Sequence, residues 1–162
     1  MKVGILTMSD KGSRGEREDK SSEEIIEKIK QIQGQVEYYK IIPDDFDVIK
    51  EELFYCCDML ELDLVLTTGG TGFSPRDNTP EATMAVVQKQ VPGIPEAMRM
   101  KSFSKTPKAM LSRAVAGIRG DTLIINLPGS PKGVRECLEV VLPVLPHGID
   151  ILTGRGGECG GK

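Results

Sequence analysis

The stretch from Leu64 to Glu81 constrains the fold of this 162-residue chain more than any other part of it. Leu64 to Leu66 form a short apolar run, which is typical of a buried strand in a parallel sheet. Glycines occupy three of the four positions from Gly69 to Gly72, and Thr79-Pro80-Glu81 has the pattern of an N-cap, an early proline and a first-turn acid of a helix. Because glycine has no side chain to block a ligand, this stretch predicts an anion site built from backbone N–H groups.

Strand and helix patterns alternate over the rest of the chain. Strands are expected at residues 3–8, 36–42, 64–66, 114–118 and 122–127, and helices at 21–33, 46–60, 80–90, 96–103 and 131–142, with a helical turn at 147–152. This alternation predicts an α/β fold in three layers with a mostly parallel sheet, and the Gly120-Asp121 turn predicts a hairpin that adds an antiparallel strand. We expect one domain at residues 1–153 and a flexible, glycine-rich tail at residues 154–162.

The composition argues against a nucleic-acid-binding protein and against a membrane protein. The formal net charge is -3 and aromatic residues make up 4% of the chain, so the basic excess and stacking side chains of nucleic-acid binders are missing. The first apolar run is too short for a signal peptide, and no run approaches the roughly 18 residues of a membrane span. Because Cys56, Cys57, Cys137 and Cys159 have the spacing of neither a zinc site nor a disulfide framework, we expect reduced cysteines in a cytoplasmic protein.

Four polar segments follow expected strands, where open α/β sheets bind their ligands. They are residues 9–15, Asp44-Asp45, residues 69–79 and residues 128–132. In the first segment Asp10 is the ligand candidate, because it directly follows the strand, and the helix after it is expected to begin with a capping box at residues 21–24. In the second segment Asp44 has two open interpretations, as the cap of the next helix or as a functional carboxylate.

The glycine loop matches neither a Walker A motif nor a dinucleotide fingerprint, because no Gly-Lys-Ser/Thr ends it and Pro75 stands where a third glycine would be. Arg76 is expected to contact a phosphate. Asp77 would repel the same phosphate, so it indicates either bound Mg²⁺ or an oriented nucleophile. The alternative is that Asp77 stabilises the turn and pairs with Arg76.

A second anion-binding helix start is expected near Ser130. Gly129 precedes this serine and Lys132 supplies a cation, while a capping role for Ser130 is compatible with ligand contact. Two such helix starts indicate a ligand with separated phosphates, or two phosphorylated ligands. His147, the only histidine, is not expected to be catalytic.

Several of these motifs resemble those of the MogA/MoaB family of molybdopterin-binding proteins. The matching segments are residues 67–72 with Arg76-Asp77 and residues 79–81, then residues 42–45, 111–113 and 126–133. The resemblance extends from residue 3 to about residue 154. It implies an α/β fold that assembles as a homotrimer, or as a hexamer in some MoaB members. It also implies transfer of AMP from Mg-ATP to the terminal phosphate of molybdopterin, with release of pyrophosphate, before molybdenum insertion.

The resemblance assigns roles to individual residues. Asp77 and Asp44 match the two acids regarded as catalytic, and Mg²⁺ is expected to arrive with ATP near them. Together with the patterns above, this makes the expected substrate-binding residues Asp10, Thr68, Gly69, Gly70, Thr71, Gly72, Arg76, Glu81, Gly129, Ser130 and Lys132.

Two other functions stay open from the sequence. One is a non-catalytic MoaB-like molybdopterin-binding or scaffold protein, although the retained Asp44 and Asp77 favour the enzyme. The other is an unrelated enzyme with a phosphate ligand, which would need both motifs by chance. Expected partners are molybdopterin, ATP, further copies of this chain and other proteins of molybdenum cofactor biosynthesis.

Overall fold

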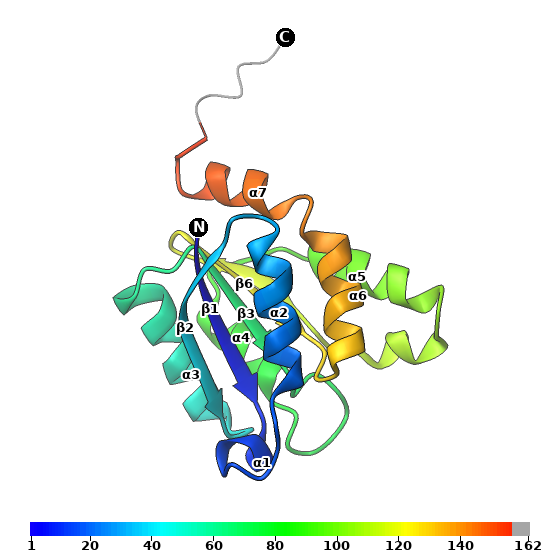
Figure 1. The fold of residues 1–162 in the computed structure, drawn as a ribbon. Helices are drawn as coiled ribbons and strands as arrows, with labels where there is room; N and C mark the ends of the chain where they lie inside the picture. The colour runs from blue at the N-terminus through cyan, green and yellow to red at the C-terminus, as the bar shows by residue number, and fades with distance from the viewer. Residues whose placement is uncertain (157–162) are drawn as a thin grey trace.

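The computed structural model describes residues 1–156, and its centre is a mixed sheet of six strands (Figure 1). Across the sheet the strands are β2 (Gln35–Ile42), β1 (Lys2–Met8), β3 (Leu64–Thr68), β6 (Thr122–Leu127), β5 (Ala116–Arg119) and β4 (Lys89–Gln90). The first four run parallel, and β5 pairs antiparallel with β6 on one side and with the edge strand β4 on the other.

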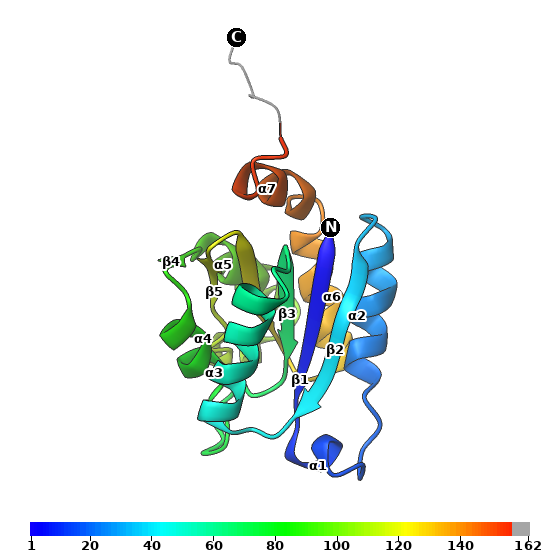
Figure 2. The ribbon, with the colours of Figure 1, turned by 90° about the vertical axis from the view of Figure 1, so that its left-hand side faces the viewer.

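Helices cover both faces of this sheet (Figure 2). One face carries α2 (Lys20–Lys30), α5 (Gly93–Phe103), α6 (Pro131–Val141) and α7 (Leu145–Leu152), and the other carries α3 (Phe46–Phe54), its π-helical continuation η1 (Tyr55–Met59) and α4 (Thr79–Val86). Two short helices, α1 (Asp10–Ser13) and the 3₁₀ helix η2 (Pro107–Leu111), lie in connections. The predicted three-layer, mostly parallel fold is therefore confirmed.

The central strands bury both of their faces. In β3, Leu64 and Leu66 pack into the core under α2 and α6, while Val65 packs into the core under α3 and α4. Successive side chains of a strand point to opposite faces, so a strand covered on both sides must be apolar throughout. This explains why the sequence shows a continuous apolar run here rather than an alternating one.

Some helix boundaries differ from the prediction. The expected capping box at residues 21–24 was wrong, because the Asp19 carboxylate accepts the hydrogen bond from the Ser22 N–H at 3.0 Å and α2 begins at Lys20. The helix expected at residues 80–90 ends at Val86, since Val87 is extended. Lys89–Gln90 then forms β4, an edge strand that pairs antiparallel with β5 and that the sequence did not predict.

Two other helices, α5 and α7, begin earlier than predicted because each contains a proline in its first turn. The helix expected from residue 96 begins at Gly93, and the turn expected at residues 147–152 is a helix from Leu145 to Leu152. Pro95 and Pro146 lie in the first turns of these helices, where a missing N–H leaves no hydrogen bond unmade. The prolines therefore start these helices rather than prevent them.

The described cysteines fit the expectation of free thiols. Cys56, Cys57 and Cys137 are buried and form no disulfide within residues 1–156, and burial raises the pKa of Cys56 to about 12. Cys159 and most of the expected tail, residues 157–162, lie outside the described residues. Within residues 1–156, none of the helices combines the length and apolar character that crossing a membrane requires.

Asn126 connects the sheet to α4 and is fully buried. Its Nδ2 donates to the hydroxyls of Thr67 and Thr83, both at 2.9 Å, and its Oδ1 accepts from the Val115 N–H at 3.2 Å. Because Asn126→Ala leaves the half-buried Val115 N–H and the buried hydroxyls of Thr67 and Thr83 without this partner, we expect the free energy of unfolding to fall by about 2–4 kcal/mol. Urea unfolding would measure the change. The control is Asn78→Ala, which removes one exposed bond of 3.3 Å, and equal losses in the two variants would contradict the prediction.

Candidate active site

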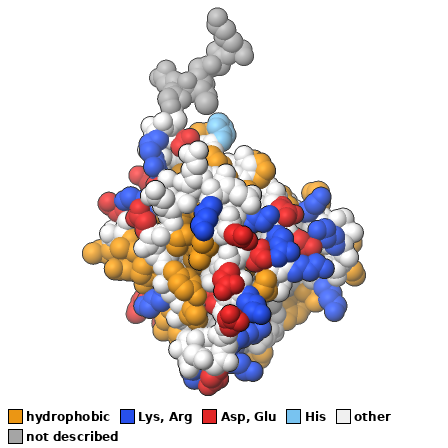
Figure 3. All heavy atoms as spheres, viewed as in Figure 1, with side chains coloured by type: hydrophobic (Ala, Val, Ile, Leu, Met, Phe, Trp, Pro, Cys, Tyr) orange, Lys and Arg blue, Asp and Glu red, His pale blue; other side chains and the backbone are white. Residues whose placement is uncertain are grey.

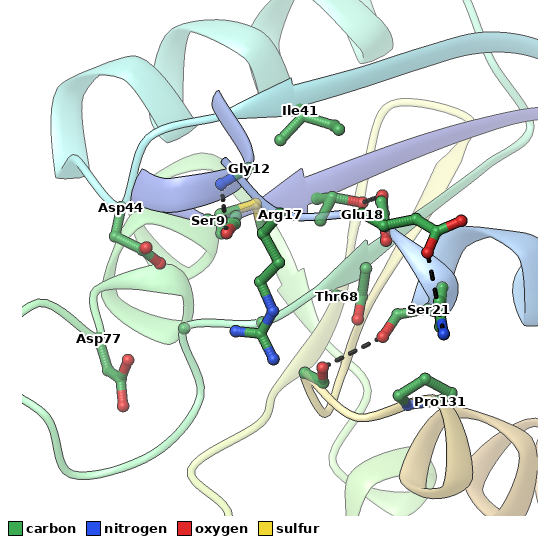
Figure 4. A pocket seen from close by; sticks show the side chains of 17 residues that line it. Ser9, Gly12, Arg17, Glu18, Ser21, Ile41, Asp44, Thr68, Asp77 and Pro131 are labelled. Carbon is green, nitrogen blue, oxygen red and sulfur yellow. Dashed lines mark hydrogen bonds and ion pairs between the residues drawn. The ribbon is translucent and has the colours of Figure 1, made fainter. Parts of the chain in front are cut away.

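The loops that follow β1, β2, β3 and β6 meet at the carboxyl edge of the sheet around a cavity of about 510 Å³ (Figure 4). The parallel arrangement brings these loops together, as expected for an open α/β sheet. Of the residues expected from the sequence, the cavity is lined by Asp44, Thr68, Gly69, Gly70, Asp77 and Gly129. We refer to this space as the first cavity.

The glycine loop has a backbone that only glycine fits well. Gly69 and Gly70 have φ angles of 95° and 66°, in the left-handed region. A Cβ on Gly69 would lie 2.5 Å from the Met8 carbonyl oxygen, and one on Gly70 would lie 2.3 Å from the Thr79 hydroxyl. Thr79 does not cap α4 as predicted, because Asn78 holds the N-cap position and the Thr79 hydroxyl donates to the Gly69 carbonyl at 2.9 Å.

The two glycine-containing motifs of the sequence are in direct contact. The Thr68 hydroxyl donates to the Pro128 carbonyl at 2.7 Å, and the Gly69 N–H donates to the Leu127 carbonyl at 3.2 Å. A Cβ on Gly129 would lie 3.3 Å from the Gly69 Cα. The turns after β3 and β6 therefore form one continuous wall.

Asp10 and Asp44 bind each other reciprocally. The Asp10 N–H donates to the Asp44 carboxylate and the Asp44 N–H donates to the Asp10 carboxylate, both at 3.0 Å. Asp45, not Asp44, caps α3 by accepting from the Val48 N–H at 3.0 Å. The capping interpretation of Asp44 is therefore wrong, and its carboxylate lies at the first cavity.

The Arg76 side chain binds the Asp10 carboxylate and is not available to a ligand through the same donors. Its Nε and Nη2 donate to the two oxygens of Asp10 at 3.0 and 2.8 Å. The hydrogen bonds from Arg76 hold the pKa of Asp10 below its usual value, whereas burial raises the pKa of Asp44, with a smaller contribution from the nearby Asp77. Arg76 is absent from the lining of the first cavity among the described residues.

Asp77 lies where the glycine loop turns toward α4. Its Oδ2 accepts from the Ser74 N–H at 3.0 Å and would lie 2.8 Å from a Cβ on Gly72, so a side chain at that position would displace the carboxylate. Half of the alternative interpretation holds, because Asp77 does stabilise a turn. The other half is wrong, since the partner of Arg76 is Asp10. Asp77 and Asp44 lie on the same side of the cavity in Figure 4.

Arg113 fastens the loop that carries Asp77. Its Nε donates to the Gly72 carbonyl at 2.7 Å, and its Nη2 donates to the Asp77 carbonyl at 2.8 Å. Its Nη1 bonds the Glu81 carboxylate, and its backbone N–H donates to the Thr71 carbonyl at 3.0 Å. Thr71, Gly72 and Glu81, which were expected to bind substrate, are thus contacts of Arg113 and do not line the first cavity among the described residues.

Ser130 and Lys132 belong to a second cavity of about 360 Å³, on the other side of the turn after β6. Ser130 caps α6, as predicted, by accepting from the Gly133 N–H at 3.1 Å. Gly129 faces the first cavity and is held there by the Ser21 hydroxyl, which donates to its carbonyl at 3.1 Å. One turn thus separates two cavities.

The loop between β1 and α2 contributes residues that the sequence analysis missed. Arg17, Asp19 and Lys20 line the first cavity, and Ser9 caps the short helix α1 by accepting from the Gly12 N–H at 2.9 Å. The loop was expected to supply only Asp10. Several cations between a strand end and a helix were a usable signal for an anion ligand.

The donor set at the first cavity suits a divalent cation that keeps part of its water shell. Within residues 1–156 no three metal-ligating side chains form a cluster. Asp44 and Asp77 offer two carboxylates, and Mg²⁺ in nucleotide sites is held by one or two carboxylates together with substrate phosphates. The residues present therefore fit Mg²⁺ that arrives with a nucleotide.

Asp44→Asn is expected to raise the free energy of unfolding at neutral pH. Burial raises the pKa of Asp44 above its usual value of 3.8, so the folded protein holds this proton more tightly than the unfolded chain does. Stability is then lost as the pH rises through the window between the two pKa values, and the asparagine variant avoids that loss. Urea unfolding between about pH 4 and pH 7 should show a difference that grows with pH. A difference independent of pH, or an equal effect of Asp47→Asn at the exposed start of α3, would contradict this expectation.

Comparisons with known proteins identify the relatives of this chain. A family model described as a probable molybdopterin binding domain matches residues 4–147. A molybdopterin adenylyltransferase of Helicobacter pylori (strain ATCC 700392 / 26695) is 49% identical over 154 residues, covering 94% of this chain and 88% of the relative. One of Escherichia coli (strain K12) is 40% identical over 156 residues, covering 92% and 80%.

Among solved structures, the molybdopterin biosynthesis enzyme MoaB of Thermus thermophilus is 54% identical. It superposes with a TM-score of 0.90 over 94% of this chain and 96% of that one. A structure of MogA has a TM-score of 0.88 at 36% identity, over 94% and 99% of the two chains. The chain therefore belongs to the molybdopterin-binding domain family, and the MogA/MoaB resemblance of its motifs is confirmed.

Proposed function

We propose that this protein is a molybdopterin adenylyltransferase of molybdenum cofactor biosynthesis, which transfers AMP from Mg-ATP to the terminal phosphate of molybdopterin and releases pyrophosphate. Curated relatives that are 40–49% identical carry this name. The structural observation that carries the proposal is the position of Asp44 and Asp77 on one side of a glycine-lined cavity. Two acids beside an anion-binding loop suit a ligand that brings both phosphates and a cation.

The reaction needs positioning and charge neutralisation more than proton transfer. An oxygen of the molybdopterin phosphate forms a bond to the α-phosphorus of ATP, and the bond to the bridging oxygen breaks, leaving its electron pair on pyrophosphate. A phosphate is already deprotonated near neutral pH, so no general base is required. The only histidine, His147, lies on α7, at the opposite end of the sheet from α1 and the loops of the site (Figure 1).

The chain's own residues hold the reacting groups. Asp44 and Asp77 would hold the Mg²⁺ that accompanies ATP, which neutralises charge on its phosphates. Gly69 and Gly70 line the first cavity and have no side chains, so a phosphate can approach their backbone closely. Asp10 orients Asp44 through their reciprocal hydrogen bonds, and Arg113 holds the loop of Asp77. Fixed positions of this kind lower the barrier because little has to move during the reaction.

Two cavities on either side of one turn suit a reaction with two substrates. We assign ATP to the first cavity, which contains the carboxylates and the glycine loop. We assign molybdopterin to the second cavity, which has the apolar Pro95 and Met98 for a flat ring and Lys132 for a phosphate. Lysine and arginine side chains gather on this side of the surface, near α5 (Figure 3). The shared turn would then be the place where the two phosphates meet.

The decisive experiment incubates the protein with molybdopterin and Mg-ATP, and measures adenylylated molybdopterin and pyrophosphate. Formation of both products in equal amounts is the expected result. Absence of turnover by folded protein that still binds molybdopterin would overturn the enzyme and favour the non-catalytic MoaB-like role. Failure to bind molybdopterin at all would favour a different phosphate ligand.

The remaining features follow from the same assignment. Residues 1–153 form the substrate-binding domain, and the protein works in the cytoplasm as a homotrimer, with a hexamer as the alternative. Exposed apolar side chains support self-association; examples are Met100, Phe103 and Met110 on α5 and η2. Light scattering during gel filtration measures the assembly, and a monomer at working concentration would refute it.

A further inference from the structure

The loop between β1 and α2 contains a cation that the described structure leaves unpaired. Arg14 binds both oxygens of Glu16 at 3.0 and 3.1 Å, and Lys20 lies 3.8 Å from Glu18. Arg17 has no hydrogen bond or ion pair from its side chain to any residue within 1–156. It nevertheless lines the first cavity.

The Arg17 side chain points into the cavity. In Figure 4 its guanidinium lies between Asp44 and Asp77 on one side and Ser21 and Pro131 on the other. Its five N–H donors are therefore available to a ligand that enters there.

The backbone beside Arg17 is fixed. Two residues later the Asp19 carboxylate accepts from the Thr7 hydroxyl at 2.6 Å, from the Tyr39 hydroxyl at 2.8 Å and from the Ser22 N–H at 3.0 Å. These bonds tie the loop to β1, β2 and α2 at once. Arg17 therefore projects from an anchored segment, which lowers the entropy lost when it binds a ligand.

The site also needs a positively charged side chain, and the residue predicted for this role from the sequence is not the one that the structure offers. ATP brings several negative charges toward Asp44 and Asp77, and Mg²⁺ neutralises only part of them. Arg76 was expected to contact phosphate, but its Nε and Nη2 both donate to Asp10, and Arg76 does not line the first cavity among the described residues. Arg17, which is unpaired within residues 1–156, faces the same space.

We infer that Arg17 binds the β- and γ-phosphates of ATP, and therefore the pyrophosphate that leaves. This inference rests on the proposed AMP transfer. As the bond between the α-phosphorus and the bridging oxygen breaks, negative charge grows on the leaving pyrophosphate, and a guanidinium beside it stabilises that charge. Arg17 thus contributes to leaving-group stabilisation as well as to nucleotide affinity.

Isothermal titration calorimetry of Arg17→Ala with Mg-ATP, Mg-pyrophosphate and AMP tests this role without molybdopterin. Loss of a bidentate, charge-assisted contact should weaken ATP and pyrophosphate binding by about 10- to 100-fold. AMP, which lacks the β- and γ-phosphates, should lose less than about threefold, because Arg17 makes no contact with it. The ATP and pyrophosphate affinities of Arg17→Lys should lie between those of the parent protein and of Arg17→Ala, because lysine retains the charge but lacks the paired N–H donors of arginine.

The matched control is Arg14→Ala, in the same loop but paired with Glu16. It should leave all three affinities near those of the parent protein. Unchanged ATP and pyrophosphate affinity in Arg17→Ala, an equal loss for AMP, an equal loss in the control, or no pyrophosphate binding by the parent protein would each overturn the inference. Thermal unfolding of each variant verifies that it is folded.

The outcome is separable from that of the proposed function. A parent protein that binds pyrophosphate through Arg17 but never adenylylates molybdopterin would refute the AMP transfer and leave the phosphate site standing. A protein that transfers AMP equally well with alanine at position 17 would refute the role of Arg17 alone.

Discussion

Asp77→Asn is expected to lower the rate constant of AMP transfer by about 10²- to 10³-fold, the size of effect found when one preorganised electrostatic group is removed from an active site. The amide oxygen of asparagine can still accept the hydrogen bond from the Ser74 N–H, so the turn should keep its shape. What is lost is the negative charge beside Gly72, at the edge of the first cavity. The affinity for molybdopterin, which we assign to the other cavity, should change by less than about threefold because its contacts remain.

Single-turnover kinetics with saturating Mg-ATP would measure the transfer rate, and fluorescence titration would measure molybdopterin affinity. Asp121→Asn serves as the control, since Asp121 is exposed in the hairpin between β5 and β6, away from both cavities. An equal loss of transfer rate and molybdopterin affinity in Asp77→Asn would mean that Asp77 is structural.

Arg113→Met should lower the transfer rate by about 10²-fold, although Arg113 touches neither cavity, because a displacement of about 1 Å in a reacting group costs that much. The methionine side chain has most of the length of the arginine side chain and none of its hydrogen-bond donors. The carbonyls of Gly72 and Asp77 lose their partner, and the Asp77 loop is no longer fixed. The free energy of unfolding should also fall, by about 2–3 kcal/mol, through the lost hydrogen bonds to half-buried groups.

Arg119→Met is the matched control for Arg113. Arg119 likewise bonds a carboxylate, that of Asp58, and a carbonyl, that of Val86 at 3.2 Å, but it lies beside η1 and away from the site. We expect this control to lose stability and to keep its transfer rate. If both variants lose stability alike and both keep the rate, Arg113 does not position Asp77. Arg113→Lys should recover part of the rate by restoring one of the donors.

The elements that frame the site could be predicted because their signals are local. Leu64 to Leu66, with the glycines after them, identify a buried strand and its loop within a few residues, and the Gly120-Asp121 turn identifies the hairpin. The carboxyl-edge rule then brought Asp44, Gly69 and Asp77 together without knowledge of any contact. β4 was missed because two exposed residues give no pattern of their own and are held only by pairing with β5.

The pairing of charged side chains could not be predicted in the same way. Arg76 is adjacent to Asp77 in sequence but binds Asp10, which is 66 positions away. Arg113 reaches the Gly72 carbonyl across 41 positions. Such partners depend on which loops contact each other in the folded protein, and a single sequence does not indicate those contacts. For the same reason, Arg17 could not be told apart from the neighbouring Arg14 and Lys20, whose side chains pair with Glu16 and Glu18.

β6 is the last strand to be synthesised, yet it lies between β3 and β5 in the middle of the sheet. On a ribosome, a chain that has emerged only through β5 has its complete glycine loop but lacks the strand that separates the two edges of the sheet. The bonds from Thr68 to Pro128 and from Gly69 to Leu127 span about 60 positions, and contacts of such range form late in folding. The wall of the first cavity should therefore be complete only when this strand has been inserted, so an incomplete chain would lack a working site.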